Sequence, residues 1–144
     1  MSESSIEVIN YLGIDYGESK VGLAIADSEV RIAFAYGRLK NDKFFRQNLL
    51  EIIKKEKISQ AIIGIPSRIN HKETVYSGEI LGDYLKKVAK ISIAYQNEMY
   101  STKLARENIK EKGLRDINRF DDEESARIIL DSWLSKKDLT CRLD

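Results

Sequence analysis

Apolar residues in the first forty positions follow the patterns of β-strands. Residues 7–15 and 21–27 are dense apolar runs, of the length expected for buried strands. In a third segment Ile32, Phe34 and Tyr36 alternate with smaller residues. The connections between the three are short, so the pattern predicts an antiparallel meander.

The first turn of this meander contains two glycines, Gly17 and Gly22. Glycine is the residue that most easily adopts a positive φ or allows another backbone to approach closely. We therefore expect one of these two features around the turn.

The rest of the chain alternates between helical and strand periodicity. The expected elements are a helix over 43–57, a strand over 58–65, a helix over 75–88, a strand over 91–96, and helices over 101–112 and 121–135. The inward face of the last helix is predicted to be Ala126, Ile129, Leu130, Trp133 and Leu134. This order predicts an α/β fold with a mixed five-stranded sheet, three strands antiparallel and two parallel, flanked by helices.

Composition narrows the function classes. The 144 residues fit one domain, 1–144, with a core of about 7–135. The charge is balanced, with 24 Lys plus Arg against 23 Asp plus Glu, which excludes a polycation. One cysteine, Cys141, and one histidine, His71, exclude an intrachain disulfide and most histidine-based metal or triad chemistry. No apolar stretch reaches the roughly 20 residues that span a bilayer, so we expect a soluble cytoplasmic protein with no membrane partner. Catalysis would then depend on carboxylates, hydroxyls and lysines.

Three carboxylates fall at informative places. Asp15 ends the first strand, Glu98 follows the last strand, and Asp122 opens the final helix in phase with its apolar face. The carboxyl ends of parallel strands meet in one crevice, which a crossing helix can complete. Clustered carboxylates repel unless a cation neutralises them, and Mg²⁺ or Mn²⁺ suits such hard oxygen ligands. The same positions also suit a turn residue, a solvated strand end and an ordinary acid at a helix start.

Four motifs, in order, resemble one family. They are Leu12-Gly-Ile-Asp-Tyr-Gly-Glu-Ser-Lys20 with Val21-Gly-Leu-Ala24, then Ile63-Gly-Ile-Pro66, Asn97-Glu-Met-Tyr-Ser-Thr102, and Asp122 through Ser125-Ala126 to Ile129-Leu130. Together they span roughly residues 8–134 and resemble the YqgF/RuvX-type family of pre-16S rRNA nucleases and Holliday junction resolvases.

The resemblance implies a ribonuclease H-like fold and a nuclease of the two-metal type, with Mg²⁺ or Mn²⁺ held by Asp15, Glu98 and Asp122. Its substrate would be structured nucleic acid, either the 5′ end of pre-16S rRNA or branched DNA. The chain departs from the family pattern at Asn97 and at Met99, where the family has Asp and Arg, which affects substrate positioning or turnover. Asp121 is an alternative or auxiliary to Asp122.

Nucleic-acid contacts are expected from local basic residues, because the net charge is only +1. The candidates are Lys20, Arg68, Lys72, Lys103 and Arg106. Each also fits an ordinary solvated or ion-paired role.

Other function classes remain at this point. Junction resolution would need two active sites and hence a dimer, and the sequence fits a monomer or a weak homodimer. A non-catalytic RNA-binding module would have the same fold with vestigial acids. The segment Gly13–Gly17 also resembles the phosphate-binding turn of sugar kinases and actin, but that architecture needs more than twice this length.

Overall fold

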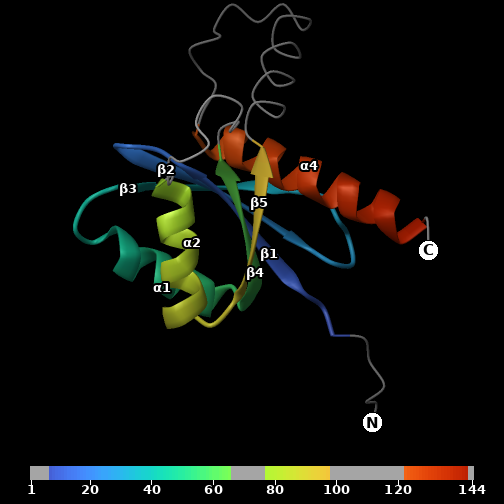
Figure 1. The fold of residues 1–144 in the computed structure, drawn as a ribbon, viewed down its shortest axis with the longest axis horizontal. Coiled ribbons are helices and arrows are strands. Elements are labelled where there is room, and N and C mark those ends of the chain that lie inside the picture. The colour runs from blue at the N-terminus through green and yellow to red at the C-terminus, as the bar shows by residue number, and fades with distance from the viewer. Residues whose placement is uncertain (1–6, 66–76, 98–121, 143–144) are drawn as a thin grey trace, which may run out of the picture.

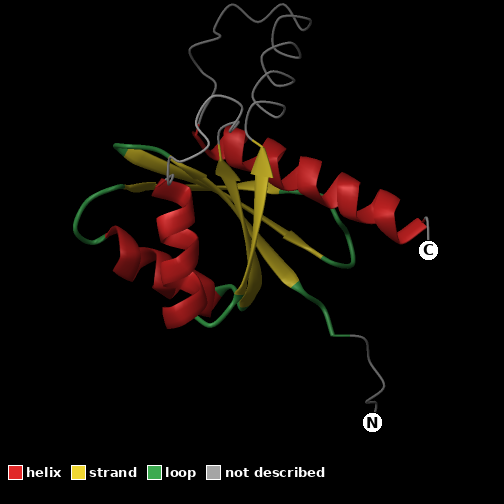
Figure 2. Ribbon diagram, in the orientation of Figure 1, coloured by secondary structure: helices red, strands yellow, loops and turns green. Residues whose placement is uncertain are grey.

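A computed structural model describes residues 7–65, 77–97 and 122–142. It contains one five-stranded sheet in the order β3-β2-β1-β4-β5, with helices on both faces (Figures 1 and 2). The strands are β1 (Asn10–Tyr16), β2 (Lys20–Asp27), β3 (Phe34–Lys40), β4 (Ile58–Ile65) and β5 (Ser92–Asn97), and the helices are α1 (Phe45–Lys55), α2 (Ser77–Val88) and α4 (Asp122–Arg142). The first three strands are antiparallel, and β4 and β5 run parallel to β1. The predicted mixed α/β sheet is confirmed.

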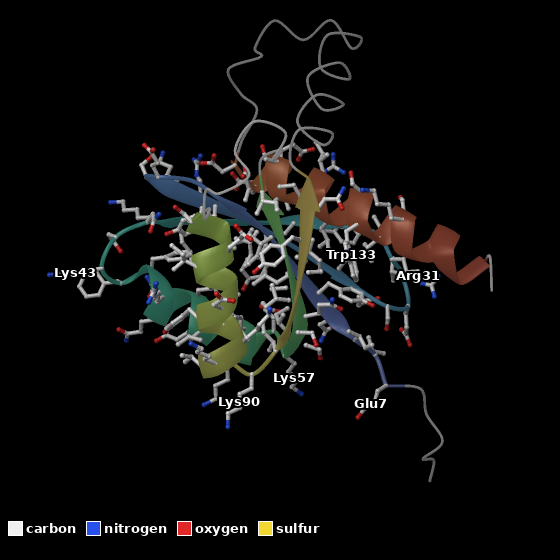
Figure 3. The ribbon with its side chains drawn as sticks, in the orientation of Figure 1. Glu7, Arg31, Lys43, Lys57, Lys90 and Trp133 are labelled. Carbon is white, nitrogen blue, oxygen red and sulfur yellow. The ribbon has the colours of Figure 1, made fainter. Side chains whose placement is uncertain are left out.

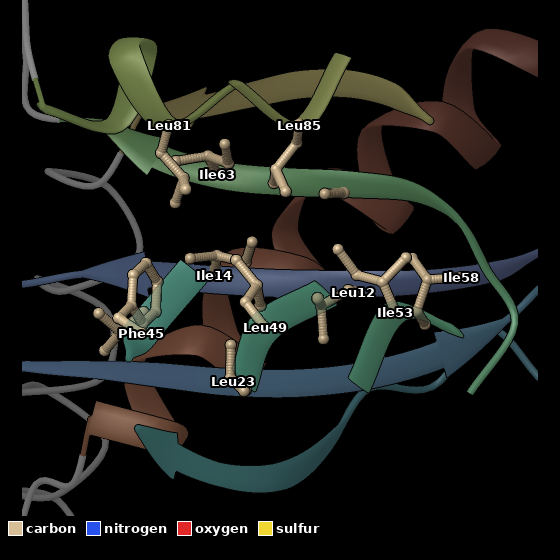
Figure 4. Close-up of a cluster of buried hydrophobic side chains, with 12 residues drawn as sticks. Leu12, Ile14, Leu23, Phe45, Leu49, Ile53, Ile58, Ile63, Leu81 and Leu85 are labelled. Atoms are coloured by element: carbon tan, nitrogen blue, oxygen red, sulfur yellow. The ribbon is translucent and has the colours of Figure 1, made fainter. Parts of the chain in front are cut away.

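One face of the sheet packs against α1 and α2. Because side chains alternate along a strand, the even-numbered residues of β1, Leu12 and Ile14, point to this face. There they meet Phe45 and Leu49 of α1, and further along Leu85 of α2, in a buried apolar cluster (Figure 4).

The opposite face is covered by α4 alone among the described helices (Figure 1). The predicted inward face is confirmed: Ala126, Ile129, Leu130 and Leu134 are buried, and Trp133 packs beside them. Trp133 makes an edge contact with Tyr11 of β1, with ring centroids 5.3 Å apart, and lies between α4 and the sheet (Figure 3).

The third strand differs from its prediction. Ile32 precedes β3, and Ile32 and Phe34 are 52% and 57% exposed, so their alternation does not mark a buried face. A turn displaces the start of the strand: Asp27 Oδ1 accepts hydrogen bonds from the backbone N–H groups of Glu29 and Val30. Since β3 is an edge strand, it also has less core to face.

Other element boundaries also differ from the predicted ones. The first strand starts at residue 10 rather than 7, and the last helix continues to Arg142 rather than residue 135. The helix predicted over 101–112 lies outside the described residues. Within the described ranges, no helix is both long and apolar enough to cross a membrane.

Candidate active site

Asp15 is the second-last residue of β1 and is half-buried. Gly13 and Tyr11, two and four positions earlier on the same strand face, lie against Ala126, Leu130 and Trp133 of α4. The period of two therefore directs Asp15 to the α4 face of the sheet, towards the start of that helix.

The start of α4 lies on Gly22, the residue that pairs with Asp15 across β1 and β2. A Cβ at position 22 would overlap the carbonyl oxygen of Asp122, so the helix backbone occupies the place of a side chain. Gly22 is thus the common neighbour of Asp15 and Asp122. The structure brings these two predicted site residues together, and the expected close backbone approach occurs at Gly22.

The turn that follows Asp15 is held by backbone and amide hydrogen bonds. Gly17 N–H donates to the carbonyl of Lys20 at 3.1 Å. Asn41, just after β3, donates from Nδ2 to the carbonyl of Gly17 at 2.8 Å and from its backbone to the carbonyl of Ser19 at 2.9 Å. These bonds fix the β1–β2 turn, and with it the strand end that carries Asp15 and Lys20.

Lys20 lies on β2 two residues before Gly22, on the same face of the sheet. The register pairs Lys20 with Lys40 and Gly22 with Arg38, which places Arg38 and Lys40 of β3 on this face as well. We call Lys20, Arg38 and Lys40 the basic strip. Arg38 also forms an ion pair with α4, because its Nε lies 3.9 Å from Glu123 Oε1.

Sequence reasoning found Lys20 but missed Arg38 and Lys40. Their spacing of two within Phe34–Lys40 was the available signal, because it puts both side chains on one strand face. The third strand was interpreted from its apolar residues instead.

The first turn of α4 is acidic, with Asp122, Glu123 and Glu124. Carboxylates are favoured there by the positive end of the helix dipole. Arg127 binds Glu124 and Asp131, at 2.8 Å from Nε to Oε1 and 3.0 Å from NH1 to Oδ2. The hydrogen bond with Glu124 raises the pKa of Arg127, against the lowering effect of burial. Arg127 is therefore engaged within α4.

The remaining predicted site residues lie outside the described residues. They are Glu98, Arg68, Lys72, Lys103 and Arg106, together with Asp121 and Met99. Their predicted roles stay predictions. The choice between Asp121 and Asp122 as the third acid also stays a prediction.

The carboxylates of Asp15 and Asp122 could supply part of the ligand set of a hard divalent cation. Asp15 and Asp122 supply carboxylate oxygens from two elements that meet at Gly22, the donor type that Mg²⁺ and Mn²⁺ prefer. Among the described residues, no group of three His, Cys, Asp or Glu side chains could hold a metal ion. The two described acids therefore need at least one further ligand.

The fold is ribonuclease H-like. The structure matches RuvC of T. thermophilus in complex with a Holliday junction substrate, with a TM-score of 0.60 and 20% identity over 90% of this chain and 95% of that one. It also matches the Fowlpox virus resolvase, with a TM-score of 0.56 and 12% identity over 89% of this chain and 98% of that one. These likenesses concern the fold.

The chain belongs to the RuvX family, whose model, described as Holliday junction resolvase, matches residues 9–136. Two similar relatives are each named "Putative pre-16S rRNA nuclease". The protein of Maridesulfovibrio salexigens is 34% identical over 132 residues, which cover 87% of this chain and 97% of the relative. The protein of Rickettsia africae is 32% identical over 129 residues, which cover 85% of this chain and 84% of the relative. The family inferred from the four sequence motifs is confirmed.

Proposed function

We propose that this chain is a metal-dependent nuclease that hydrolyses phosphodiester bonds during processing of the 5′ end of pre-16S rRNA. The observation that carries the proposal is the meeting of Asp15 and Asp122 at Gly22, in a chain whose relatives are named as nucleases of this RNA. A cytoplasmic location goes with it, because pre-rRNA is processed where ribosomes are assembled.

In this proposal Asp15 and Asp122 hold the cation, and Glu98 is the third ligand by its resemblance to the family motif. Two bound Mg²⁺ or Mn²⁺ ions would supply an activated water and charge stabilisation for the departing oxygen. The chain itself sets the geometry. The sheet fixes Asp15, and the contact of α4 with Gly22 fixes the backbone of Asp122 relative to it.

The basic strip would bind phosphates of the nucleic-acid backbone beside the carboxylates. Lys20 and Lys40 are exposed at one end of β2 and β3, and Arg38 pairs with Gly22 itself. Phosphate contacts of this kind position a substrate without reading its sequence. Arg68, Lys72, Lys103 and Arg106 are proposed to extend the same surface.

A second candidate function is cleavage of a four-way DNA junction, which the description of the matching family model favours. The carboxylates would perform the same hydrolysis on either backbone. Junction resolution additionally needs two active sites, and therefore a homodimer, whereas RNA processing needs one.

The test is a cleavage assay in Mg²⁺ or Mn²⁺ with three end-labelled substrates: a pre-16S rRNA 5′ leader, a four-way DNA junction and a linear duplex. We expect the wild type to cleave the leader, and Asp15→Asn to leave it uncut. The variant should keep its stability within about 1 kcal/mol, or gain some, because it removes repulsion between carboxylates.

Cleavage of the junction alone would select the second function. Binding without cleavage of any substrate would indicate a non-catalytic RNA-binding module with vestigial acids. Normal cleavage by Asp15→Asn would refute the assignment of Asp15.

A further inference from the structure

Gln96, near the end of β5, is a polar side chain placed where apolar ones are expected. It is 3% exposed, and it is the single buried polar residue in the described part of the chain. Its Nε2 is buried and has no hydrogen-bond partner among the residues that the structure describes. A buried donor without a partner lowers stability, so a folded chain retains one where something else compensates.

The sheet register relates Gln96 to the candidate active site. Ala94, two residues earlier, belongs to the cluster under α4, so Gln96 faces α4 too. Gln96 pairs with Gly64 of β4, and Gly64 follows Ile63, the partner of Ile14, so it lies beside Asp15. Asp15, Gly64 and Gln96 therefore form one row across three neighbouring strands.

Gly64 has no side chain, so none stands between the other two on this row. The backbones of Asp15 and Gln96 are separated by two strand spacings, about 10 Å. Figure 1 shows that β4 and β5 both end close to the first turns of α4, where Asp122 lies. Gln96 therefore lies on the α4 face of the sheet, two strands from Asp15 and on a strand that contacts α4.

The chemistry of the amide identifies what it would bind. An N–H donor needs an acceptor, and the non-bridging oxygens of a phosphodiester are strong anionic acceptors. A preformed donor that costs no reorganisation is effective at a water-excluded site. We propose that Gln96 donates a hydrogen bond from Nε2 to a phosphate oxygen of the nucleic-acid backbone at this site. The inference rests on the proposed nuclease function.

The experiment replaces Gln96 by an apolar residue of similar length, Gln96→Met, and measures both thermal unfolding and kcat/KM on the pre-16S rRNA leader. We expect the Tm of the free protein to rise by about 2–6 °C, because the unsatisfied donor is gone. We expect kcat/KM to fall at least about tenfold, because a phosphate contact is lost. Gln60→Met is the matched control, since half-buried Gln60 lies on the same face of β4 towards its opposite end. This control should leave kcat/KM unchanged.

A purely structural role for Gln96 predicts the reverse pattern. A lower Tm for Gln96→Met would show that the amide is satisfied in the folded protein, and would overturn the proposal. If the wild type is active and Gln96→Met has the same kcat/KM, the proposal for Gln96 is also overturned. The proposed nuclease function would then still stand. A wild type that cleaves neither the leader nor the junction would overturn the nuclease function itself, and this inference with it.

Discussion

Among single residues, the candidate site depends most on Gly22, which has no side chain. Gly22 pairs with Asp15 on one side and touches the backbone of Asp122 on the other. Any larger residue would separate the two acids. The two carboxylates come from positions 107 residues apart in the chain, yet a single glycine sets their spacing.

The basic strip gives a prediction at the same scale. Lys20→Ala should weaken binding of the rRNA leader and lower the slope of log affinity against log salt by about 0.7–0.9, the contribution of one phosphate contact. Affinity measured at several salt concentrations checks this. Lys43→Ala is the control, because Lys43 precedes α1 at the periphery, away from α4 (Figure 3). An unchanged slope for Lys20→Ala would remove Lys20 from the interface.

Some residues of the candidate site could be located from the sequence and others could not. The positions of Asp15 near a strand end and of Asp122 at a helix start were predictable, because both are local properties of the sequence. Their roles as metal ligands stay predictions. Gln96 was not, because its importance comes from its register beside Gly64 and from a missing partner. Both are properties of the assembled sheet. Arg38 was missed because the third strand was interpreted from its apolar residues, and a register shift in the β2–β3 pairing separates its face from that of Phe34.

At the scale of elements, the packing of α4 against the meander aligns the site. Small residues let the helix approach: a Cβ on Gly13 would lie 2.8 Å from Leu130 Cβ and 2.9 Å from the carbonyl oxygen of Ala126. Further along the helix, Asp131 Oδ1 accepts a hydrogen bond from the backbone N–H of Ala33 at 2.9 Å. The helix is thus held near its start, at Gly22, and near its middle, at Asp131.

Gly22→Ala tests this packing. The added methyl group would overlap the backbone of Asp122, which cannot move aside as a flexible side chain could. We expect a loss of about 1–3 kcal/mol in the free energy of unfolding. We also expect a loss of cleavage larger than that of destabilised variants elsewhere, because Asp122 is displaced.

The control is Ala35→Val, which adds carbon atoms at an exposed position of β3 and should change stability by less than about 0.5 kcal/mol. Chemical denaturation measures both variants. A Gly22→Ala protein with wild-type stability and activity would contradict the placement of the helix start on β2.

At the scale of the whole molecule, the sequence predicted the order of the described elements and the mixed sheet. It did so because apolar periodicity and short connections leave few topologies. It could not predict how the third strand begins, since side-chain hydrogen bonds of Asp27 decide that locally. A close backbone approach was expected near Gly22, but not that the start of α4 makes it, because that contact joins parts of the chain far apart in sequence.

Asp15 and Asp122 are proposed to belong to one metal-binding nuclease site. The decisive measurement is a titration of Mn²⁺ into the wild type, Asp15→Asn, Asp122→Asn and the double variant. Loss of a ligand should weaken Mn²⁺ binding by more than about tenfold. If both acids share the cation, the double variant should lose little more than either single one. Asp83→Asn, at an exposed position of α2, should bind Mn²⁺ as the wild type does.

Unfolding without metal should show all these variants folded, so that a weaker affinity reports on the site itself. We expect strong, non-additive losses of Mn²⁺ affinity for Asp15→Asn and Asp122→Asn. Wild-type Mn²⁺ affinity in both single variants, or losses that simply add as for two independent sites, would contradict it.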